Sequence, residues 1–312
     1  MQQEHRGSVR TPTRCGRSFR RPGRRGNAVT GRTLDQSVLE SWIGRREEAT
    51  DLIDPRTARL MQATLDRTPS LEPGDALPPL WHWLYFPTVV AQKDLGRDGH
   101  PKLGGFLPPV DLPRRMWAGG RFGFERALRL GESAQRISEI KSVRLKEGRS
   151  GPLCFVTVRH EIFAGGSFCF WEEHDIVYRE DPKPGSVAAV PPDAPRESDW
   201  QRRVEPSPIL LFRYSALTFN GHRIHYDRQY AMEIEGYPGL VFHGPLTATL
   251  LFDLLLEQNP GCWVSSYQFR AVSPLFDTAA FTLMGKRADS GIELWAVNPA
   301  GRLAMTAQAE ML

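Results

Sequence analysis

The sequence predicts an α+β protein whose two similar halves each wrap an antiparallel sheet around a buried helix. Three observations lead to this prediction. Period-two alternation marks strands between residues 121 and 179, and a second set of strands fills residues 265–310. Each set follows a segment that is apolar on all sides and therefore needs cover on every face. Glycine turns between successive strands are typical of antiparallel pairing.

The first 33 residues differ from the rest in charge. They hold nine arginines and one acid, Glu4, so that a net charge of +4 for the chain divides into +8 here and −4 elsewhere. Because this segment has little to bury, we expect it to be disordered. Its composition fits a mitochondrial transit segment, and an extension without function explains it as well. A nucleic-acid-binding arm is disfavoured, since Phe19 is its one aromatic residue.

The overall composition is that of a soluble globular protein, with 40% hydrophobic and 24% charged residues. No apolar run approaches the roughly 20 residues that a membrane-spanning helix needs. We therefore expect a cytoplasmic protein without membrane or nucleic-acid partners, or a protein of the mitochondrial matrix if residues 1–33 are a transit segment. The four cysteines form no C-x-x-C pair, which favours free thiols over disulfides or zinc ligands. They are Cys15, Cys154, Cys169 and Cys262.

The N-terminal half is expected at residues 34–180. Asp54 and Pro55 are typical of an N-cap and first helical residue, and the helix that they start should end before Pro69. Residues 78–86 are densely aromatic, of about helical length, and should be buried. A long loop at 94–120 follows, for which a functional role and a merely connecting one both stay open. Strands are then predicted at 136–146, 156–162 and 168–178.

A proline-rich linker is predicted at residues 181–208, before a C-terminal half at 209–312. Here a buried helix at 244–257 should be stopped by the turn at 259–261. Strands follow, each bounded by turn residues. We expect them at 265–275, 279–288, 291–298 and 302–310.

Candidate chemistry gathers in the loop that precedes this helix. His225 is flanked by apolar residues and can accept and return a proton near neutral pH. Asn220 cannot carry protons, but its amide can orient a water molecule. Gly244 starts the helix, where backbone amides lack intrahelical acceptors and can bind a developing oxyanion. Asp227 is expected to cap the helix that follows the loop.

Several neighbours are candidates for substrate binding. In the loop and at the helix start these are His222, Arg223 and His243, and the arginines Arg114, Arg115 and Arg270 are candidates for a carboxylate or phosphate. We expect no metal, because His222, His225 and His243 lack a carboxylate or thiol partner at ligand spacing. His82 and His100 are expected to be structural.

Residues 218–227, with Ala231, residues 236–239 and the pair His243-Gly244, resemble the hydratase motif of hot-dog-fold enoyl-thioester hydratases and dehydratases. The chain is most similar to the double hot-dog (MaoC-like) branch with mesaconyl-CoA and itaconyl-CoA hydratases and type 2 3-hydroxyacyl-thioester dehydratases. Weaker resemblance extends over residues 34–312. It lies at residues 79–86, 104–109, 114–120 and 172–178.

This resemblance implies a double hot-dog hydro-lyase that acts on an acyl-CoA thioester and needs no cofactor beyond the coenzyme A of its substrate. It implies that His225 is the catalytic histidine and Gly244 the oxyanion donor. The common single hot-dog hydratases have an aspartate where this chain has Asn220. The first half lacks a matching loop, so we expect one site per chain, with that half as its wall.

Within this family the expected substrate is a short branched or dicarboxylic acyl-CoA, such as mesaconyl- or itaconyl-CoA. A longer-chain dehydratase acting on CoA or acyl carrier protein is the alternative. A hot-dog thioesterase, or a protein that only binds acyl-CoA, represents a different class. A homo-oligomer is compatible with each of these.

Overall fold

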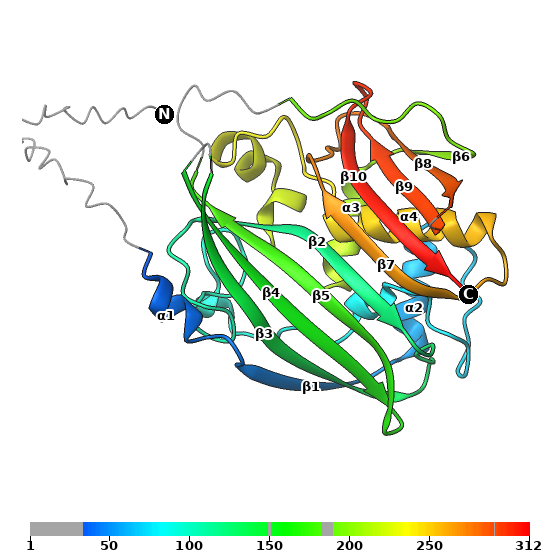
Figure 1. Ribbon diagram of the computed structural model, residues 1–312, viewed down its shortest axis with the longest axis horizontal. Helices are drawn as coiled ribbons and strands as arrows, with labels where there is room; N and C mark the ends of the chain where they lie inside the picture. The colour runs from blue at the N-terminus through cyan, green and yellow to red at the C-terminus, as the bar shows by residue number, and fades with distance from the viewer. Residues whose placement is uncertain (1–33, 149–150, 182–189, 290) are drawn as a thin grey trace, which may run out of the picture. The chain divides into compact units, whose positions relative to one another are not determined.

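A ten-stranded antiparallel sheet runs through the described residues in the order β1-β3-β4-β5-β2-β7-β10-β9-β8-β6 (Figure 1). The computed structural model describes residues 34–148, 151–181, 190–289 and 291–312, and the predictions for residues 1–33 and Cys15 fall outside them. The strands are β1 (Arg46–Leu52), β2 (Arg114–Phe124), β3 (Ser133–Gly148), β4 (Gly151–Ala164), β5 (Ser167–Arg179), β6 (Trp200–Val204), β7 (Val264–Ala271), β8 (Phe281–Ala288), β9 (Gly291–Val297) and β10 (Leu303–Met311).

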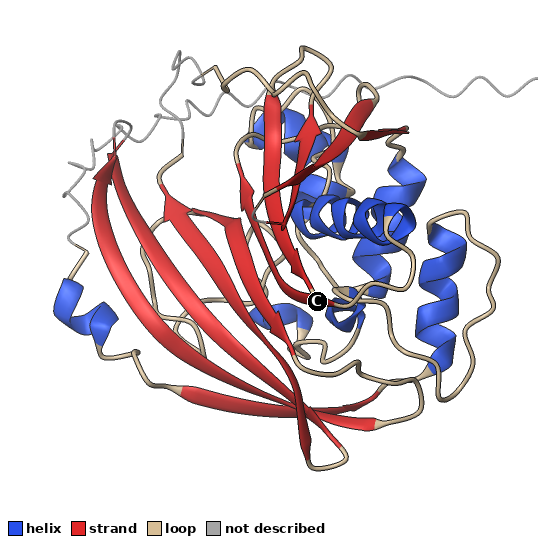
Figure 2. Cartoon of the chain, turned by 45° about the vertical axis from the view of Figure 1, so that its right-hand side comes forward, coloured by secondary structure: helices blue, strands red, loops and turns tan. Residues whose placement is uncertain are grey.

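Four α-helices and four short turns of other helix types accompany the sheet in these residues. They are α1 (Gln36–Glu40), α2 (Pro55–Thr64), α3 (Pro208–Leu217), α4 (Gly244–Gln258), the 3-10 turns η1 (Trp81–Leu84), η2 (Gln92–Asp94) and η3 (Arg223–His225), and the π turn η4 (Tyr230–Ile234). Apart from α1, the helices gather on one side of the curved sheet (Figure 2). The α+β prediction is confirmed.

The two halves of the sheet join where β2 pairs with β7, from Gly119 opposite Arg270 to Gly123 opposite Ser266. The strands approach closely here: a Cβ atom on Gly119 would lie 2.5 Å from the carbonyl oxygen of Phe269. Glycine is therefore required for the junction. One hydrophobic core crosses it, with residues of both halves packed together.

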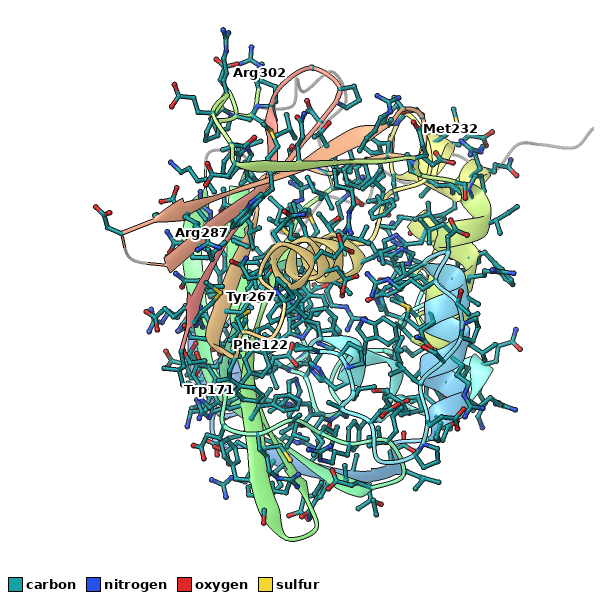
Figure 3. All side chains as sticks on the ribbon, turned by 90° about the vertical axis from the view of Figure 1, so that its right-hand side faces the viewer. Phe122, Trp171, Met232, Tyr267, Arg287 and Arg302 are labelled. Atoms are coloured by element: carbon teal, nitrogen blue, oxygen red, sulfur yellow. The ribbon has the colours of Figure 1, made fainter. Side chains whose placement is uncertain are left out.

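Helix α4 lies at the centre of this core, as its all-round apolar sequence predicts. Ten of its residues are buried, including Leu246, Leu250 and Leu254. Figure 3 labels Tyr267 beside α4, where its ring centroid lies 4.8 Å from that of Phe252, and its hydroxyl donates to the carbonyl of Ala248 at 3.0 Å. The helix is thus anchored to the sheet by a hydrogen bond as well as by packing.

In the N-terminal half, α2 begins as predicted. The side chain of Asp54 accepts from the amide of Thr57 at 3.1 Å, and Pro55 is the first helical residue. The aromatic segment is buried as expected, with Trp81 only 1% exposed. It makes one 3-10 turn rather than a longer helix, because Leu80 and Phe86 on either side adopt positive φ angles of 69° and 56°.

Two sequence boundaries need correction. The loop predicted to reach residue 120 ends earlier, because β2 begins at Arg114. The predicted linker contributes an edge strand, since β6 pairs with β8 from Trp200 opposite Gly285 to Val204 opposite Phe281. Cys154, Cys169 and Cys262 are free thiols, as expected. Among the described residues, no helix has the length and apolarity to cross a membrane.

Candidate active site

The candidate site is built on the loop between α3 and α4. The loop turns sharply after α3, where Phe219 adopts a positive φ of 51° and the amide of Asn220 donates to the carbonyl of Ser215 at 2.8 Å. It then runs beside the segment that leads into α4, because the amide of Val241 donates to the carbonyl of Ile224 at 3.0 Å. These backbone bonds bring η3 against the N-terminus of α4.

His225 is held in one orientation. Its side chain is 7% exposed, and its Nδ1 lies 2.7 Å from the carbonyl oxygen of Val241. A carbonyl oxygen only accepts hydrogen bonds, so Nδ1 carries the proton and Nε2 carries a lone pair. Burial lowers the pKa of His225 to about 4, although its bond to Val241 acts in the opposite direction. His225 is therefore a neutral base at neutral pH.

His243 lies beneath His225 and has no exposed surface. The two rings stack with centroids 3.7 Å apart, and Nε2 of His243 lies 2.9 Å from the hydroxyl oxygen of Ser215. Among the described residues, its buried Nδ1 has no hydrogen-bond partner. Burial, with His225 and His222 nearby, lowers the pKa of His243 well below its ordinary value. Since it does not line the cavity, His243 supports His225 rather than facing a ligand.

Asn220 and His222 lie on the cavity side of the loop. The side-chain Oδ1 of Asn220 accepts from the amide of His222 at 3.0 Å, which leaves the Nδ2 group of Asn220 as a donor for a ligand. The ring of His222 is 5.4 Å from that of His225. Burial lowers the pKa of His222 well below its ordinary value, so this ring is also neutral. Both residues line the same cavity as His225.

The cavity has a volume of about 2240 Å³ and extends from the loop between α3 and α4, called the catalytic loop below for its proposed role, to the start of α4, where Gly244 lines it. This volume is more than twice that of a typical small-molecule pocket, which is about 300–1,000 Å³. A Cβ atom added to Gly244 would meet no atom of the described residues within 4 Å, so the backbone is open to a ligand at this point. Pro245 has no amide hydrogen, which leaves the Gly244 amide available at the helix start.

The predicted arginines occupy different environments. Arg114 is buried and paired with Glu235 at 2.9 Å and Asp181 at 3.1 Å. Arg115 lines the cavity, and its positive charge contributes to the lowered pKa of His222. Arg270 is exposed and does not line the cavity, so the structure does not bring it to the site.

The contacts of Arg223 are structural, as are those of Arg114. Its Nη2 lies 2.7 Å from Oδ2 of Asp227, and its guanidinium lies 4.1 Å from the ring centroid of Tyr230. Asp227 also accepts from the amide of Tyr230 at 3.0 Å, which is the capping role expected of it. Arg223 therefore braces the loop and does not line the cavity.

Two further polar residues, Asp98 and His100, lie beside the catalytic loop; the sequence alone does not indicate Asp98 as a site residue, and it predicts a structural role for His100. Nδ1 of His100 lies 2.9 Å from Oδ2 of Asp98, and the ring of His100 lies 4.3 Å from that of His222. One atom from each of Asp98, His100 and His222 could ligate a metal ion, and these atoms lie within 4.8 Å of one another. The available signal was the long glycine-rich loop of the first half, whose role the sequence left open.

A second buried polar cluster lines the cavity from the N-terminal half. Glu172 is 3% exposed and accepts from Nε2 of His82 at 2.9 Å and from Nε1 of Trp83 at 3.0 Å. Burial favours the neutral acid, but the bond from His82 and the histidines nearby hold the pKa of Glu172 at about 2. His160 and His174 lie close by, with the pKa of each lowered by burial.

The sequence matches the family "Hydroxyacyl-thioester dehydratase type 2" over residues 80–277. It is 46% identical over 273 residues to the mesaconyl-C(4)-CoA hydratase of Chloroflexus aurantiacus, a match that covers 87% of this chain and 97% of the relative. It is 30% identical over 237 residues to the mitochondrial hydroxyacyl-thioester dehydratase type 2 of Schizosaccharomyces pombe, covering 66% of this chain and 75% of the relative.

The fold also matches solved structures. One is a Mycobacterium tuberculosis protein described as having a double hot-dog fold, with a TM-score of 0.55 and 13% identity over 86% of this chain and 96% of that one. At this level of identity the match concerns the fold alone. It confirms the expectation of a double hot-dog architecture.

Proposed function

The chain belongs to the hydroxyacyl-thioester dehydratase type 2 family, and we propose that it adds water across the double bond of a short 2,3-enoyl-CoA thioester, or removes it. It is a hydro-lyase, as the hydratase and dehydratase names of its relatives indicate. The observation that carries the proposed mechanism is the bond between His225 Nδ1 and the carbonyl of Val241, which leaves Nε2 as a base.

In hydration, Nε2 of His225 takes a proton from water while the hydroxide oxygen bonds to C3 of the substrate. The electron pair of the double bond moves toward the thioester carbonyl, where the amide of Gly244 stabilises the negative charge of the enolate. The proton then passes from Nε2 of His225 to C2, which restores the neutral histidine. Asn220 orients the water through its Nδ2 group. Dehydration is the reverse of these steps.

For the substrate we propose a short branched or dicarboxylic acyl group, such as that of mesaconyl-CoA. The name of the Chloroflexus relative, at 46% identity over nearly its whole length, supports this choice. Arg115 supplies a positive charge in the cavity that fits a free carboxylate, whereas Arg114 is already paired with Glu235 and Asp181. Among the arginines considered, Arg115 is therefore the one that we assign to the substrate.

A longer-chain 3-hydroxyacyl-thioester dehydratase is the second candidate, because the cavity of about 2240 Å³ is larger than a short acyl group needs. Such an enzyme would accept long acyl groups on CoA or on an acyl carrier protein.

Mass spectrometry of purified protein with mesaconyl-, crotonyl- and a longer enoyl-CoA tests these proposals. We expect gain of one water, fastest with mesaconyl-CoA. Faster turnover of the longer substrate would favour the second candidate. Release of free thiol without hydration would indicate a thioesterase, and binding without any product would indicate a carrier protein.

Substitution of Arg115 tests the substrate assignment. Arg115→Met should raise KM for mesaconyl-CoA by about tenfold or more, the loss expected for a charge-assisted contact, while leaving crotonyl-CoA little changed. Arg270→Met removes an arginine outside the cavity and is the matched control. Equal effects of Arg115→Met on both substrates would show that Arg115 does not bind the carboxylate.

A further inference from the structure

A segment of the N-terminal half lies directly against the catalytic loop. The amide of Arg223 donates to the carbonyl of Asp98 at 2.9 Å, and Nη1 of Arg223 donates to the carbonyl of Arg97 at 3.2 Å. Gly99 has a φ of +89°, and a Cβ atom there would lie 1.9 Å from the carbonyl oxygen of Gly221. The two backbones therefore touch at a point where only glycine fits.

Asp98 and His100 stand on either side of this contact. Oδ1 of Asp98 accepts from the amide of His100 at 3.0 Å, and Oδ2 accepts from Nδ1 of the same residue at 2.9 Å. Because an ionised carboxylate only accepts, the proton of His100 resides on Nδ1. Its ring lies 4.3 Å from that of His222, which in turn lies 5.4 Å from that of His225.

This geometry favours a proton-handling pair over a metal centre. Both carboxylate oxygens of Asp98 already accept hydrogen bonds from His100, which reduces the negative charge that they could offer to a cation. The positive charge of Arg115 is also close enough to oppose the protonation of His100, and it would oppose a bound cation in the same way. We therefore treat Asp98 and His100 as a carboxylate and an imidazole joined by a hydrogen bond.

We propose that Asp98 and His100 are positioning residues of the hydration site. Asp98 fixes the tautomer and orientation of His100, and the ring of His100 holds His222 beside His225. The carboxylate also offsets the positive charge that builds up when His225 takes the proton from water. The N-terminal half thus supplies the carboxylate that the loop lacks at Asn220. This inference rests on the proposed function and deepens it.

The charges around the pair are consistent with this role. His100 faces Asp98 on its own loop, Arg115 on β2, and His222 and His225 on the catalytic loop. Burial and Arg115 lower the pKa of His100 and that of His222, and the neighbouring histidines lower the latter further. The carboxylate of Asp98 acts against this net lowering, because its negative charge favours the protonated form of both rings. Asp98 is therefore the group that makes positive charge on these histidines less costly.

Asp98→Asn tests the role of the carboxylate in the full-length protein, with whichever enoyl-CoA the wild type hydrates. We expect kcat to fall by about 10- to 100-fold while KM changes by less than about threefold, because the charge acts on the proton transfer and not on substrate binding. Asp94→Asn is the matched control, since Asp94 is exposed on the same segment. Its kcat should stay within about twofold of the wild type.

His100 variants separate positioning from simple packing. In His100→Asn the amide group can still donate to Asp98, so this variant should retain more kcat than His100→Leu, which has similar bulk and no donor. Equal activity of the two variants would contradict the proposal. Activity that disappears on chelation, with stoichiometric metal found in the purified protein, would overturn it in favour of a metal site formed by Asp98, His100 and His222.

A measurement independent of activity completes the test. In ¹⁵N-histidine-labelled protein at neutral pH, the ring nitrogen shifts of His100 should report a proton on Nδ1, and Asp98→Ala should move the proton toward Nε2. An unchanged tautomer overturns the proposal even if no substrate is turned over. If His225→Ala abolishes hydration while Asp98→Asn has normal kcat, the proposed function stands and this inference fails.

Discussion

The ring of His225 lies parallel to that of His243 within 19°, at a centroid distance of 3.7 Å. His243 is itself fixed by Ser215, whose hydroxyl oxygen lies 2.9 Å from its Nε2. The face of the His225 ring is restrained by stacking on His243, and its edge is restrained by the hydrogen bond from Nδ1 to the carbonyl of Val241. Its orientation is therefore determined before any substrate arrives, and such preorganisation is what proton transfer needs.

Substitution of His243 should expose the importance of the stacked ring. His243→Phe keeps a planar ring against His225 but removes the contact with Ser215 and places a slightly larger ring in a fully buried position, so we expect kcat to fall by less than about tenfold. His243→Ala leaves a cavity beneath the base, and misplacement of about 1 Å can lower the rate about 100-fold. Steady-state kinetics of the two variants check this order. If the Phe variant were as impaired as the Ala variant, a nitrogen of His243 would be essential instead.

Gly244→Val should impair catalysis without impairing folding. A Cβ atom at this position would meet no atom of the residues that the structure describes within 4 Å, so the fold has room for a side chain to begin there. That side chain would occupy the place beside the amide where the thioester carbonyl binds, and we expect kcat/KM to fall by about 100-fold. Urea unfolding should give a free energy within about 1 kcal/mol of the wild type. Normal kinetics for this variant would remove Gly244 from the mechanism.

The pH dependence of kcat/KM should reflect the depressed pKa of His225. Since burial lowers that pKa to about 4, the base stays unprotonated and active down to about pH 5, and activity should fall to half near pH 4. A histidine with an ordinary pKa would lose activity near pH 6.5. A half-point near 6.5 would show that His225 is not desolvated in the active protein.

Stability must be followed in the same experiment by circular dichroism. The buried histidines of the site bind fewer protons in the folded than in the unfolded state, because the pKa of each is lowered. As pH falls below about 6.5, the unfolded state gains protons that the folded state does not, and stability decreases. A loss of activity reports protonation of His225 only at pH values where circular dichroism shows that the protein is still folded.

Glu172→Gln should destabilise the N-terminal half. The carboxylate accepts from both His82 and Trp83, and a neutral amide cannot serve both donors equally, so we expect a loss of about 1–3 kcal/mol in unfolding free energy at pH 7. The folded pKa of about 2 lies below the unfolded value, so this stabilisation is complete above about pH 4.3 and is lost as pH falls toward 2.

The cost of the substitution should therefore be smaller at pH 3 than at pH 7. Glu173→Gln, at the neighbouring and more exposed position paired with Arg121, is the matched control and should cost less than about 1 kcal/mol. A cost for Glu172→Gln that is independent of pH would contradict an ionised carboxylate in the folded state.

Much of the fold could be predicted from sequence because the signals are local. Alternation defines β3, β4 and β5, and the all-round apolar run with its helix-starting proline defines α4. Strand β6 could not be found in this way, since its five residues lie in a proline-rich stretch and pair with β8 across about 80 residues. Positive φ angles at Leu80 and Phe86 likewise have no residue-type signal.

The residues of the candidate site also divide into those that local sequence could predict and those that it could not. His225, Asn220 and Gly244 could be proposed from two short stretches near each other in sequence, residues 218–227 and the pair His243-Gly244, and the structure brings them to one cavity. Asp98 and His100 could not, because their relation to His222 depends on the backbone contact between Gly99 and Gly221, more than 100 residues apart. For the same reason sequence could not separate Arg115 from Arg114 and Arg270.

The central claim is that Nε2 of His225 is the base that activates water. The most direct measurement is the rate of hydration of mesaconyl-CoA, or of the enoyl-CoA that the wild type prefers, by His225→Ala, with circular dichroism to verify its fold. The account predicts a loss of about 10²- to 10⁴-fold in kcat, the range for removal of a general base. A folded His225→Ala variant that hydrates the substrate at a rate close to that of the wild type would contradict it.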